Sequence, residues 1–519
     1  MENGRSFYNL SIKNSIVKFK TTILDYKTQF TYKEDHDVRV VPLALSFPCC
    51  FKYCNCDNKE LMDIVIIGAG ISGISLAYRL TELKRGNSAI GTITVIDKGS
   101  EAGGCIKTVC NNGFLIESGP NGILYSKKHV RELYNRAGLE KQLQISSPLA
   151  KRKYIQLAGR LHAVPSGPLS ALTSKLLSFS GKMRLLKEPF VPPKIDDADE
   201  SIAEFAVRRI GAEAADNLIT AVVGGIYAGD SSKISIKSAF PRMYAMERNH
   251  GSLVRGMIKS KEKKTQKDPD RNLRSMLISS HTGMHGLVTA LAERCAGMVD
   301  FRYGTSVEKV EKIDKGYRIY CDNGILECGR LAVCCSAYDA ANFLNPLDET
   351  LAEMLAGVTY APIFIYGMGF KSKDIAHRLN GFGYLVTPKE KSVVLGTLFS
   401  SSIFSGRAPE GKSLLTAITV GDRNRELFAL GSEELKGMIF DQVKNVLGLK
   451  AAPESITIFR HERSIPQYYI GHSAVTAKAA ELSKLLRTFY LGGNSCYGIS
   501  VADCIQTSLN IADKIEADL

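Results

Sequence analysis

The feature that most constrains this chain is a glycine-rich turn between two apolar segments. Residues 64–67 (Ile-Val-Ile-Ile) form a continuous apolar run, which is typical of a parallel strand buried on both faces. The run leads into residues 68–73 (Gly-Ala-Gly-Ile-Ser-Gly) and a segment with helical apolar spacing, and residues 93–96 predict a second strand that ends at Asp97. This order predicts a βαβ unit. Its first glycine permits the tight turn, its second lets backbone approach a pyrophosphate, and its third allows close helix–strand packing.

The acid at the end of the second predicted strand narrows the choice of nucleotide. A carboxylate there accepts hydrogen bonds from a ribose diol and disfavours a 2′-phosphate, so Asp97 predicts FAD or NAD rather than NADP. Two further glycine elements follow, at residues 103–104 and 119–122. NAD dehydrogenases do not need them, whereas large flavoproteins pass backbone beneath an extended FAD. The pattern therefore favours FAD, and the alternative is that these elements are two surface turns.

The end of the chain completes the same domain. Residues 488–491 predict a strand, and residues 493–494 (Gly-Asn) and 498–501 (Gly-Ile-Ser-Val) lead into a C-terminal helix. We expect the N-terminus of this helix to face the flavin pyrimidine, where its dipole would stabilise negative charge on the reduced flavin. The expected fold class is α/β, with a Rossmann-like FAD domain that opens near the N-terminus and closes at the C-terminus.

Two insertions interrupt the FAD domain. Residues 147–250 are basic and helical in pattern, and residues 312–460 alternate apolar and polar side chains as a mixed sheet does. We therefore expect an FAD domain over residues 62–146, 251–311 and 461–519. The segment 147–250 is expected to be a helical insertion, and the segment 312–460 a substrate domain.

The first 61 residues differ from the rest of the chain. They lack periodicity and end in four closely spaced cysteines, namely Cys49, Cys50, Cys54 and Cys56. We expect a disordered leader or a misassigned start here, because no apolar core follows the early lysines and several acidic residues argue against a transit peptide. A metal site is disfavoured, since no second ligand pair stands at the usual distance. A chain that begins at Met62 is expected to fold and to bind FAD.

Composition limits the class of protein more than it limits the partner. The 519 residues, 45% hydrophobic and 23% charged, fit more than one globular domain and exclude a collagen-like or mainly disordered chain. No apolar run of about 18 residues occurs, which excludes a multi-span membrane protein. The net charge of +14 indicates an anionic partner, but it does not choose among nucleic acid, an acidic membrane and a polycarboxylate. Thirteen scattered cysteines favour a reducing, cytosolic compartment.

Further motifs carry a family resemblance. The segment from Gly283 to Leu287 resembles the Gly-Met-x-x-Leu turn of the flavin amine oxidase superfamily. Within that superfamily the chain from Met62 onwards resembles the protoporphyrinogen oxidases. The segments that carry this closer resemblance are residues 183–190, 201–211, 225–230, 238–241, 395–401 and 465–472.

The resemblance implies a molecule of three parts: an FAD domain, a mixed-sheet substrate domain, and a helical domain that dips into a membrane face. The reaction it implies is the removal of six electrons from protoporphyrinogen IX to give protoporphyrin IX, with O2 as the final acceptor, in haem biosynthesis. We expect hydride to leave a methylene bridge of the substrate for flavin N5, without a strong protein base.

A porphyrinogen is a large apolar ring with peripheral carboxylates, so it needs an apolar slot with cations at the rim. The resemblance places Phe382, Leu385 and Phe399 on the walls of this slot. It aligns Lys153 with an arginine that holds a propionate in the family. Because lysine cannot form the bidentate fork of arginine, we expect the adjacent Arg152 to share this role.

FAD is expected to bind non-covalently. His461 takes the place of the usual tryptophan near the flavin in a chain that has no tryptophan, and Cys105 takes the place of a common lysine. Cys496 is assigned to packing rather than to covalent attachment. The residues assigned to the cofactor are Gly68, Ala69, Gly70, Ile71, Ser72, Gly73, Asp97, Lys98, Gly103, Gly104, Cys105, Gly119, Pro120, Asn121, Gly122, Val307, His461, Gly493, Asn494, Ile499, Ser500 and Val501.

The expected partners are a porphyrinogen, O2 and an anionic membrane surface. The protein is expected to be cytoplasmic and peripherally associated with the inner face of that membrane. Ferrochelatase or a second copy of this chain is a further candidate partner, and neither nucleic acid nor a metal is expected.

Two alternatives stay open. The first changes the substrate to coproporphyrinogen III, which bears four carboxylates and is oxidised to coproporphyrin III. The second is a flavin-free binding module of the Rab escort and GDP-dissociation-inhibitor type, which has no reason to retain every phosphate-facing glycine. Flavin absorbance of the purified protein would distinguish the enzyme from the binding module.

Overall fold

The computed structural model describes residues 62–165, 170, 173–262 and 273–518. The expectations for the first 61 residues, their cysteines included, lie outside this part.

A five-stranded parallel sheet forms the base of the nucleotide half. Its order is β10-β2-β1-β14-β20, and every neighbouring pair is parallel. The five strands come from the start, middle and end of the chain: β1 (Met62–Ile67), β2 (Ile90–Asp97), β10 (Val299–Tyr303), β14 (Arg330–Val333) and β20 (Phe489–Leu491). The chain thus returns twice to complete one sheet, as the sequence predicts for its two ends.

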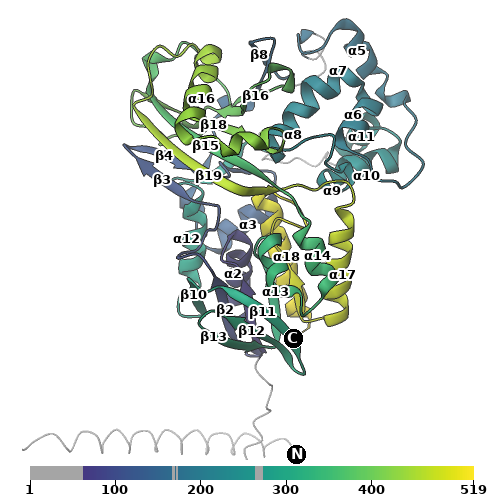
Figure 1. Cartoon of the computed structure of the whole chain (residues 1–519), viewed down its shortest axis with the longest axis vertical. Coiled ribbons are helices and arrows are strands. Elements are labelled where there is room, and N and C mark those ends of the chain that lie inside the picture. The colour runs from purple at the N-terminus through teal and green to yellow at the C-terminus, as the bar shows by residue number, and fades with distance from the viewer. Residues whose placement is uncertain (1–61, 166–169, 171–172, 263–272, 519) are drawn as a thin grey trace, which may run out of the picture. The chain divides into compact units, whose positions relative to one another are not determined.

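Both faces of this sheet are covered (Figure 1). On one face the core packs against α2 (Ile71–Gly86), α3 (Lys128–Arg136), α12 (His285–Arg294) and α18 (Val501–Ala517). On the other it packs against α13 (Ala337–Leu344), α14 (Glu349–Ala356), α17 (Ser473–Leu486) and the antiparallel sheet β11 (Val307–Ile313), β12 (Gly316–Cys321) and β13 (Gly324–Cys328). Burial on both faces explains why residues 64–67 of β1 are an unbroken apolar run.

A second, mixed sheet has seven strands in the order β19-β15-β18-β17-β16-β7-β8, with one parallel pair, β16 with β7. The strands are β7 (Tyr154–Leu157), β8 (Arg160–Ala163), β15 (Tyr360–Lys371), β16 (Gly383–Val386), β17 (Val394–Leu398), β18 (Lys412–Val420) and β19 (Ser455–Pro466). Helix α16 (Ser432–Leu447) covers one face with Leu435, Ile439 and Val443. The α/β architecture with a mixed sheet is thereby confirmed.

Strand pairing divides the chain differently from the expected boundaries. Residues 312–356 contribute β12 to β14, α13 and α14 to the nucleotide half, so the mixed sheet begins at β15 rather than at residue 312. The hairpin β7–β8 joins the mixed sheet from within the expected helical insertion, and β19 extends to Pro466. A short alternating strand does not reveal which sheet it pairs with, because its pattern reports one buried face and not the partner.

The helical part lies beside the mixed sheet (Figure 1). It comprises α5 (Phe179–Leu186), α6 (Ile202–Ile210), α7 (Ala212–Ala214), α8 (Thr220–Tyr227), α9 (Ile236–Ala239), α10 (Pro241–His250) and α11 (Leu253–Glu262). Ser201 and Glu204 form a capping box that starts α6. Arg209, which is 0% exposed, pairs with Glu188 and Glu247 at the centre of these helices. No helix in the described ranges is long and apolar enough to span a bilayer.

Smaller elements connect these units. They are the pair β3 (Thr108–Asn111) and β4 (Phe114–Glu117), the sheet β5 (Ile123–Leu124), β9 (Leu277–Ser280) and β6 (Leu143–Ile145), and the short helix α15 (Ser400–Ile403).

Candidate flavin and substrate site

The first glycine turn has the backbone geometry that its sequence predicts. Gly68 has φ +109° and donates its N–H to Ile96 O (2.7 Å), so the turn starts at the tip of β1. A methyl group on Gly73 would lie 1.8 Å from Gly68 O, whereas one on Gly70 would meet no atom within 4 Å. Gly73 is therefore a packing glycine, and Gly70 leaves open space beside the backbone.

Helix α2 opens directly after that space. Its N-cap, Gly70, has no side chain to cap the helix, and its first turn carries no acidic residue. The first backbone N–H groups of a helix lack intrahelical partners and carry the positive end of its dipole. Ile71, Ser72 and Gly73 therefore present donors suited to a phosphate. Ser72 O accepts from Ser508 Oγ (2.7 Å), which fixes α18 against this turn.

Asp97 is held against the same turn. Its Oδ2 accepts from Ala69 N (2.6 Å), and its Oδ1 accepts from Gly99 N (2.7 Å). Each carboxylate oxygen keeps a second lone pair, so the group can still accept from ribose hydroxyls. Val307 begins β11 close by, because Thr305 N donates to Asp97 O (3.0 Å). Lys98 instead points to the surface and pairs with Asp339 (2.7 Å).

The second glycine element packs on the first. Gly103 N donates to Ala69 O (2.9 Å), and Gly103 bridges Gly70 in a parallel β-bridge. A methyl group on Gly104 (φ +58°) would come within 3.6 Å of Gly70 Cα. The structure thus brings into contact two elements that are related in the sequence only by their glycine motifs.

The third element follows through Cys105. Its carbonyl accepts from Ser118 Oγ (2.9 Å), and a methyl group on Gly119 would lie 2.9 Å from it. Pro120 and Asn121 are half-buried, and a methyl group on Gly122 would approach the Phe404 ring to 3.2 Å. His461, on β19 of the mixed sheet, bonds Ser118 O through Nε2 (2.7 Å). His461 therefore ties the mixed sheet to this element.

The C-terminal element closes the site. Gly493 and Gly498 have φ +83° and +116°, and Ser500 caps α18 by accepting from Asp503 N (3.1 Å). Asn494, Ile499 and Val501 belong to the same turn and helix start. Burial raises the pKa of Cys496 to about 12, so its thiol stays protonated and unreactive.

Three residues in this region were missed by sequence reasoning. Glu117 and Arg407 form a buried ion pair (3.1 Å), and the Tyr468 hydroxyl bonds the backbone of residues 494 and 498. The sequence does not show that a charged residue in a strand and another in a distant loop contact each other. The tyrosine lies within the segment 465–472, so its place in a family motif was the one available signal.

The substrate-side residues are brought together in part. Arg152 O accepts from Phe382 N (2.7 Å), and Lys153 Nζ lies 5.7 Å from the centre of the Phe382 ring. Leu385 points to the face of the mixed sheet opposite α16, where its side chain abuts Gly225 of α8.

Phe399 differs from the expectation. It is 0% exposed, and its ring packs against Tyr154, His377 and Tyr384 in the core beneath α16. Phe399 follows the end of β17 and is the N-cap residue of α15, and its ring packs into the core cluster beneath α16, whereas Leu398 packs with the Phe404 cluster. Phe399 is therefore a core residue and does not line a slot.

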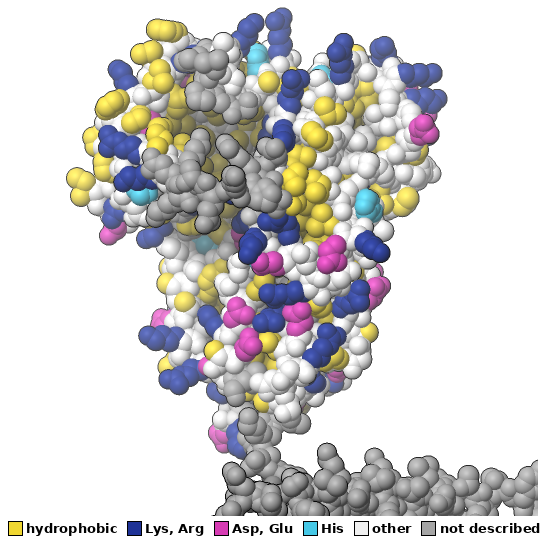
Figure 2. Space-filling view, turned by 180° about the vertical axis from the view of Figure 1, so that it is seen from behind, with side chains coloured by type: hydrophobic (Ala, Val, Ile, Leu, Met, Phe, Trp, Pro, Cys, Tyr) yellow, Lys and Arg dark blue, Asp and Glu magenta, His cyan; other side chains and the backbone are white. Residues whose placement is uncertain are grey.

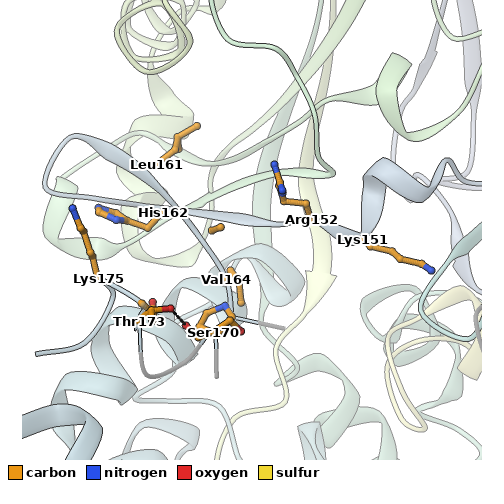
Figure 3. A pocket seen from close by; sticks show the side chains of 11 residues that line it. Lys151, Arg152, Leu161, His162, Val164, Ser170, Thr173 and Lys175 are labelled. Carbon is orange, nitrogen blue, oxygen red and sulfur yellow. Dashed lines mark hydrogen bonds between the residues drawn. The ribbon is translucent and has the colours of Figure 1, made fainter. Parts of the chain in front are cut away.

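A cavity of about 600 Å³ lies next to the β7–β8 hairpin. Its described lining includes the basic residues Lys151, Arg152, His162 and Lys175 and no carboxylate. Arg152 and Lys151 point in different directions, and Thr173 Oγ1 donates to Ser170 O at the opposite wall (Figure 3). Arg152 is the one predicted site residue on its lining, and the glycine elements do not reach it.

Comparison with known proteins now decides the family. The model described as flavin containing amine oxidoreductase matches residues 71–516. The chain belongs to the flavin-containing amine oxidoreductases. This membership confirms the resemblance seen in the sequence.

Relatives within this family carry porphyrinogen oxidase names. Protoporphyrinogen oxidase 1, chloroplastic, of Spinacia oleracea is 30% identical over 476 residues, covering 88% of this chain and 84% of its own. Coproporphyrinogen III oxidase of Bacillus subtilis (strain 168) is 28% identical over 460 residues, covering 86% and 96%. A solved structure assigned as a protoporphyrinogen oxidase, from Exiguobacterium sp. 255-15, superposes with a TM-score of 0.74 at 23% identity and covers 88% and 99%.

The cofactor of this flavin-containing oxidoreductase is FAD, as the sequence predicts, and the chain is an FAD-dependent enzyme. The residues present fit the group. Open space at Gly70, left-handed backbone at Gly103 and Gly493, and a free helix N-terminus at Ile71 together suit an extended dinucleotide.

Proposed function

We propose that this enzyme oxidises protoporphyrinogen IX to protoporphyrin IX in haem biosynthesis, with O2 as the final acceptor. One observation carries the proposal. Phe382, with Lys153 over its ring, packs in an apolar cluster with Phe404, and Phe404 reaches the third glycine element at Gly122. An apolar wall with a cation at its edge thus adjoins the flavin cradle, which suits an apolar ring with carboxylates at its periphery.

The glycine elements, Asp97 and the start of α18 would hold FAD in this proposal. When bound, FAD would accept two electrons at a time from the porphyrinogen and pass them on to O2. The chain itself orients the ring through Phe382 and Leu385 and holds a propionate with Lys153 and Arg152. The lysine ammonium acts as a point charge, whereas the planar guanidinium of Arg152 can donate two parallel hydrogen bonds to the propionate carboxylate.

The test measures porphyrin formation with two substrates under saturating O2. Protoporphyrinogen IX should give the higher kcat/KM. Replacing Arg152 and Lys153 together with Ala should raise KM more than it lowers kcat, because a propionate contact acts equally before and during the reaction. Lys436→Ala, an exposed cation paired with Glu433 on α16, is the matched control. A higher kcat/KM for coproporphyrinogen III would contradict the proposal and indicate that coproporphyrinogen III is the substrate.

We also propose that the protein is cytoplasmic and that its helical part contacts an anionic membrane peripherally, at the inner face of that membrane. Large apolar side chains stand out from it, with exposed fractions of 79% for Phe179, 80% for Phe190 and 92% for Ile195. Lys182 and Lys187 lie among them in sequence, and Figure 2 shows lysines and arginines interspersed with apolar side chains on this end. Apolar insertion and roughly 1 kcal/mol per basic residue near anionic lipid would act together.

Vesicle flotation tests this contact. Phe179→Ser with Phe190→Ser should weaken binding to anionic vesicles, and salt should weaken binding of the unchanged protein. Leu485→Ser is the control, since Leu485 is 75% exposed on α17 of the nucleotide half. Equal binding to neutral and anionic vesicles would contradict the proposal. Ferrochelatase or a second copy of the chain, as a partner that accepts the product, stays a prediction.

A further inference from the structure

Tyr468 is a buried tyrosine whose hydroxyl holds both ends of the C-terminal glycine turn. It is 1% exposed. Its Oη donates to Asn494 O (2.6 Å) and accepts from Gly498 N (3.0 Å). One hydroxyl thus spans residues 494–498, the turn that leads to the N-cap Ser500 and the start of α18.

The ring of Tyr468 is itself held by two neighbouring rings. His472 stacks on it, with ring centres 4.1 Å apart and planes 11° from parallel. Tyr227, at the end of α8, lies 6.3 Å away in a tilted arrangement, and Gln467 Nε2 donates to Tyr227 O (2.8 Å). The hydroxyl therefore cannot move without displacing the stack or the end of α8.

The turn also has support from a neighbouring element. Thr476 Oγ1, on α17, donates to Cys496 O (3.1 Å) at the middle of the turn. That contact holds the centre, whereas Tyr468 sets the separation of Asn494 from Gly498. The separation matters because the N-terminus of α18 carries a partial positive charge whose effect falls off within about one turn.

We propose that Tyr468, fixed by the His472 ring, is a positioning residue that places the turn at residues 494–498 and the N-terminus of α18 against the bound flavin. The helix end then stabilises the negative charge that the flavin gains on reduction. The proposal rests on the FAD site and not on the identity of the substrate.

Tyr468→Phe tests it, because this variant keeps the ring and the stack and removes both hydrogen bonds. We expect this variant to retain FAD, with a shifted flavin absorbance spectrum and a lower reduction potential. Its kcat should fall about tenfold at unchanged KM, because one or two hydrogen bonds to the backbone of the turn are lost. Tyr469→Phe is the matched control: its hydroxyl donates to Asp422 Oδ2 (2.5 Å), away from the turn. Its spectrum and potential should equal those of the unchanged protein.

Spectrum and potential are measured without porphyrinogen, so their outcome is separate from the proposed function. An unchanged spectrum and potential in Tyr468→Phe would overturn the proposal, as would an equal shift in Tyr469→Phe. If Tyr468→Phe does not yield holoprotein, the spectra and potentials of His472→Ala and His472→Phe test the proposal instead. A shift in His472→Ala that is restored in His472→Phe, which keeps the stack, supports the proposal, and no shift in either overturns it.

Discussion

Arg407 and Glu117 form an ion pair of 3.1 Å in which both side chains are 3% exposed. Glu117 ends β4, directly before the third glycine element, and also accepts from Met284 N (3.0 Å) and Thr108 Oγ1 (2.6 Å). Arg407 lies between α15 and β18 and donates to Ser279 Oγ (2.8 Å). The pair therefore joins the flavin cradle to the segment that leads into the mixed sheet.

Removing one partner should be costly. Burial raises the pKa of Glu117, and the Arg407 guanidinium opposes this rise, so the carboxylate depends on its partner to stay ionised. Arg407→Ala should lower the free energy of unfolding by about 3–5 kcal/mol. Arg318→Ala breaks an exposed pair with Glu327 (2.8 Å) and should cost less than about 1 kcal/mol. Urea unfolding of the two holoproteins measures both, and equal losses would show that the buried pair has no special role.

Gly70→Leu should give a folded protein without flavin. A side chain at Gly70 meets no protein atom within 4 Å, so it fills the space beside the backbone where the pyrophosphate is expected. Gly86→Leu is the matched control, because Gly86 at the other end of α2 also meets no atom within 4 Å. Absorbance in the visible range and circular dichroism check cofactor and fold. Stoichiometric FAD in Gly70→Leu would place the cofactor elsewhere.

Phe399→Ala should mainly lower stability, whereas Phe382→Ala should mainly raise KM. Phe399 is a core residue, so its truncation should lower the free energy of unfolding by about 3–5 kcal/mol while KM stays near its original value at low temperature. Phe382 is half-buried beside Lys153, so its truncation should raise KM with a smaller loss of stability. Steady-state kinetics and thermal melting measure the two effects. If instead Phe399→Ala raises KM and Phe382→Ala mainly lowers stability, Phe399 rather than Phe382 contacts the substrate.

The glycine elements show how far sequence could predict this molecule. The βαβ unit, Asp97 and the closing role of the C-terminus followed from apolar runs and glycine spacing, because parallel strands and close backbone approaches restrict which residues fit. Sequence similarity placed Phe399 at a slot, but the chain leaves β17 at Leu398, and the Phe399 ring packs into the core. The pairing of β7–β8 with β16 depends on contacts between distant segments, and no local pattern encodes them.

Acid should destabilise the protein through His472. Burial lowers the pKa of His472 to about 4 from an ordinary 6.5. The unfolded state therefore binds more protons between these values, and stability is lost as pH falls from 6.5 towards 4, by about 3 kcal/mol in total from this group. His472→Phe keeps the stack on Tyr468 without a titrating group and should flatten the slope. Unfolding free energies at a series of pH values measure it, and parallel slopes for the two proteins would contradict a neutral buried imidazole.

The most direct test of the proposed activity is the flavin absorbance of purified holoprotein mixed with protoporphyrinogen IX in the absence of O2, and then exposed to O2. We predict that the visible flavin absorbance falls before O2 is admitted, because the flavin takes two of the six electrons. Porphyrin fluorescence should rise, and the flavin absorbance should return, once O2 is admitted to accept the remaining electrons. If the flavin absorbance stays constant while porphyrin forms no faster than in enzyme-free solution, this substrate does not pass electrons to the flavin of this protein, and the account is contradicted.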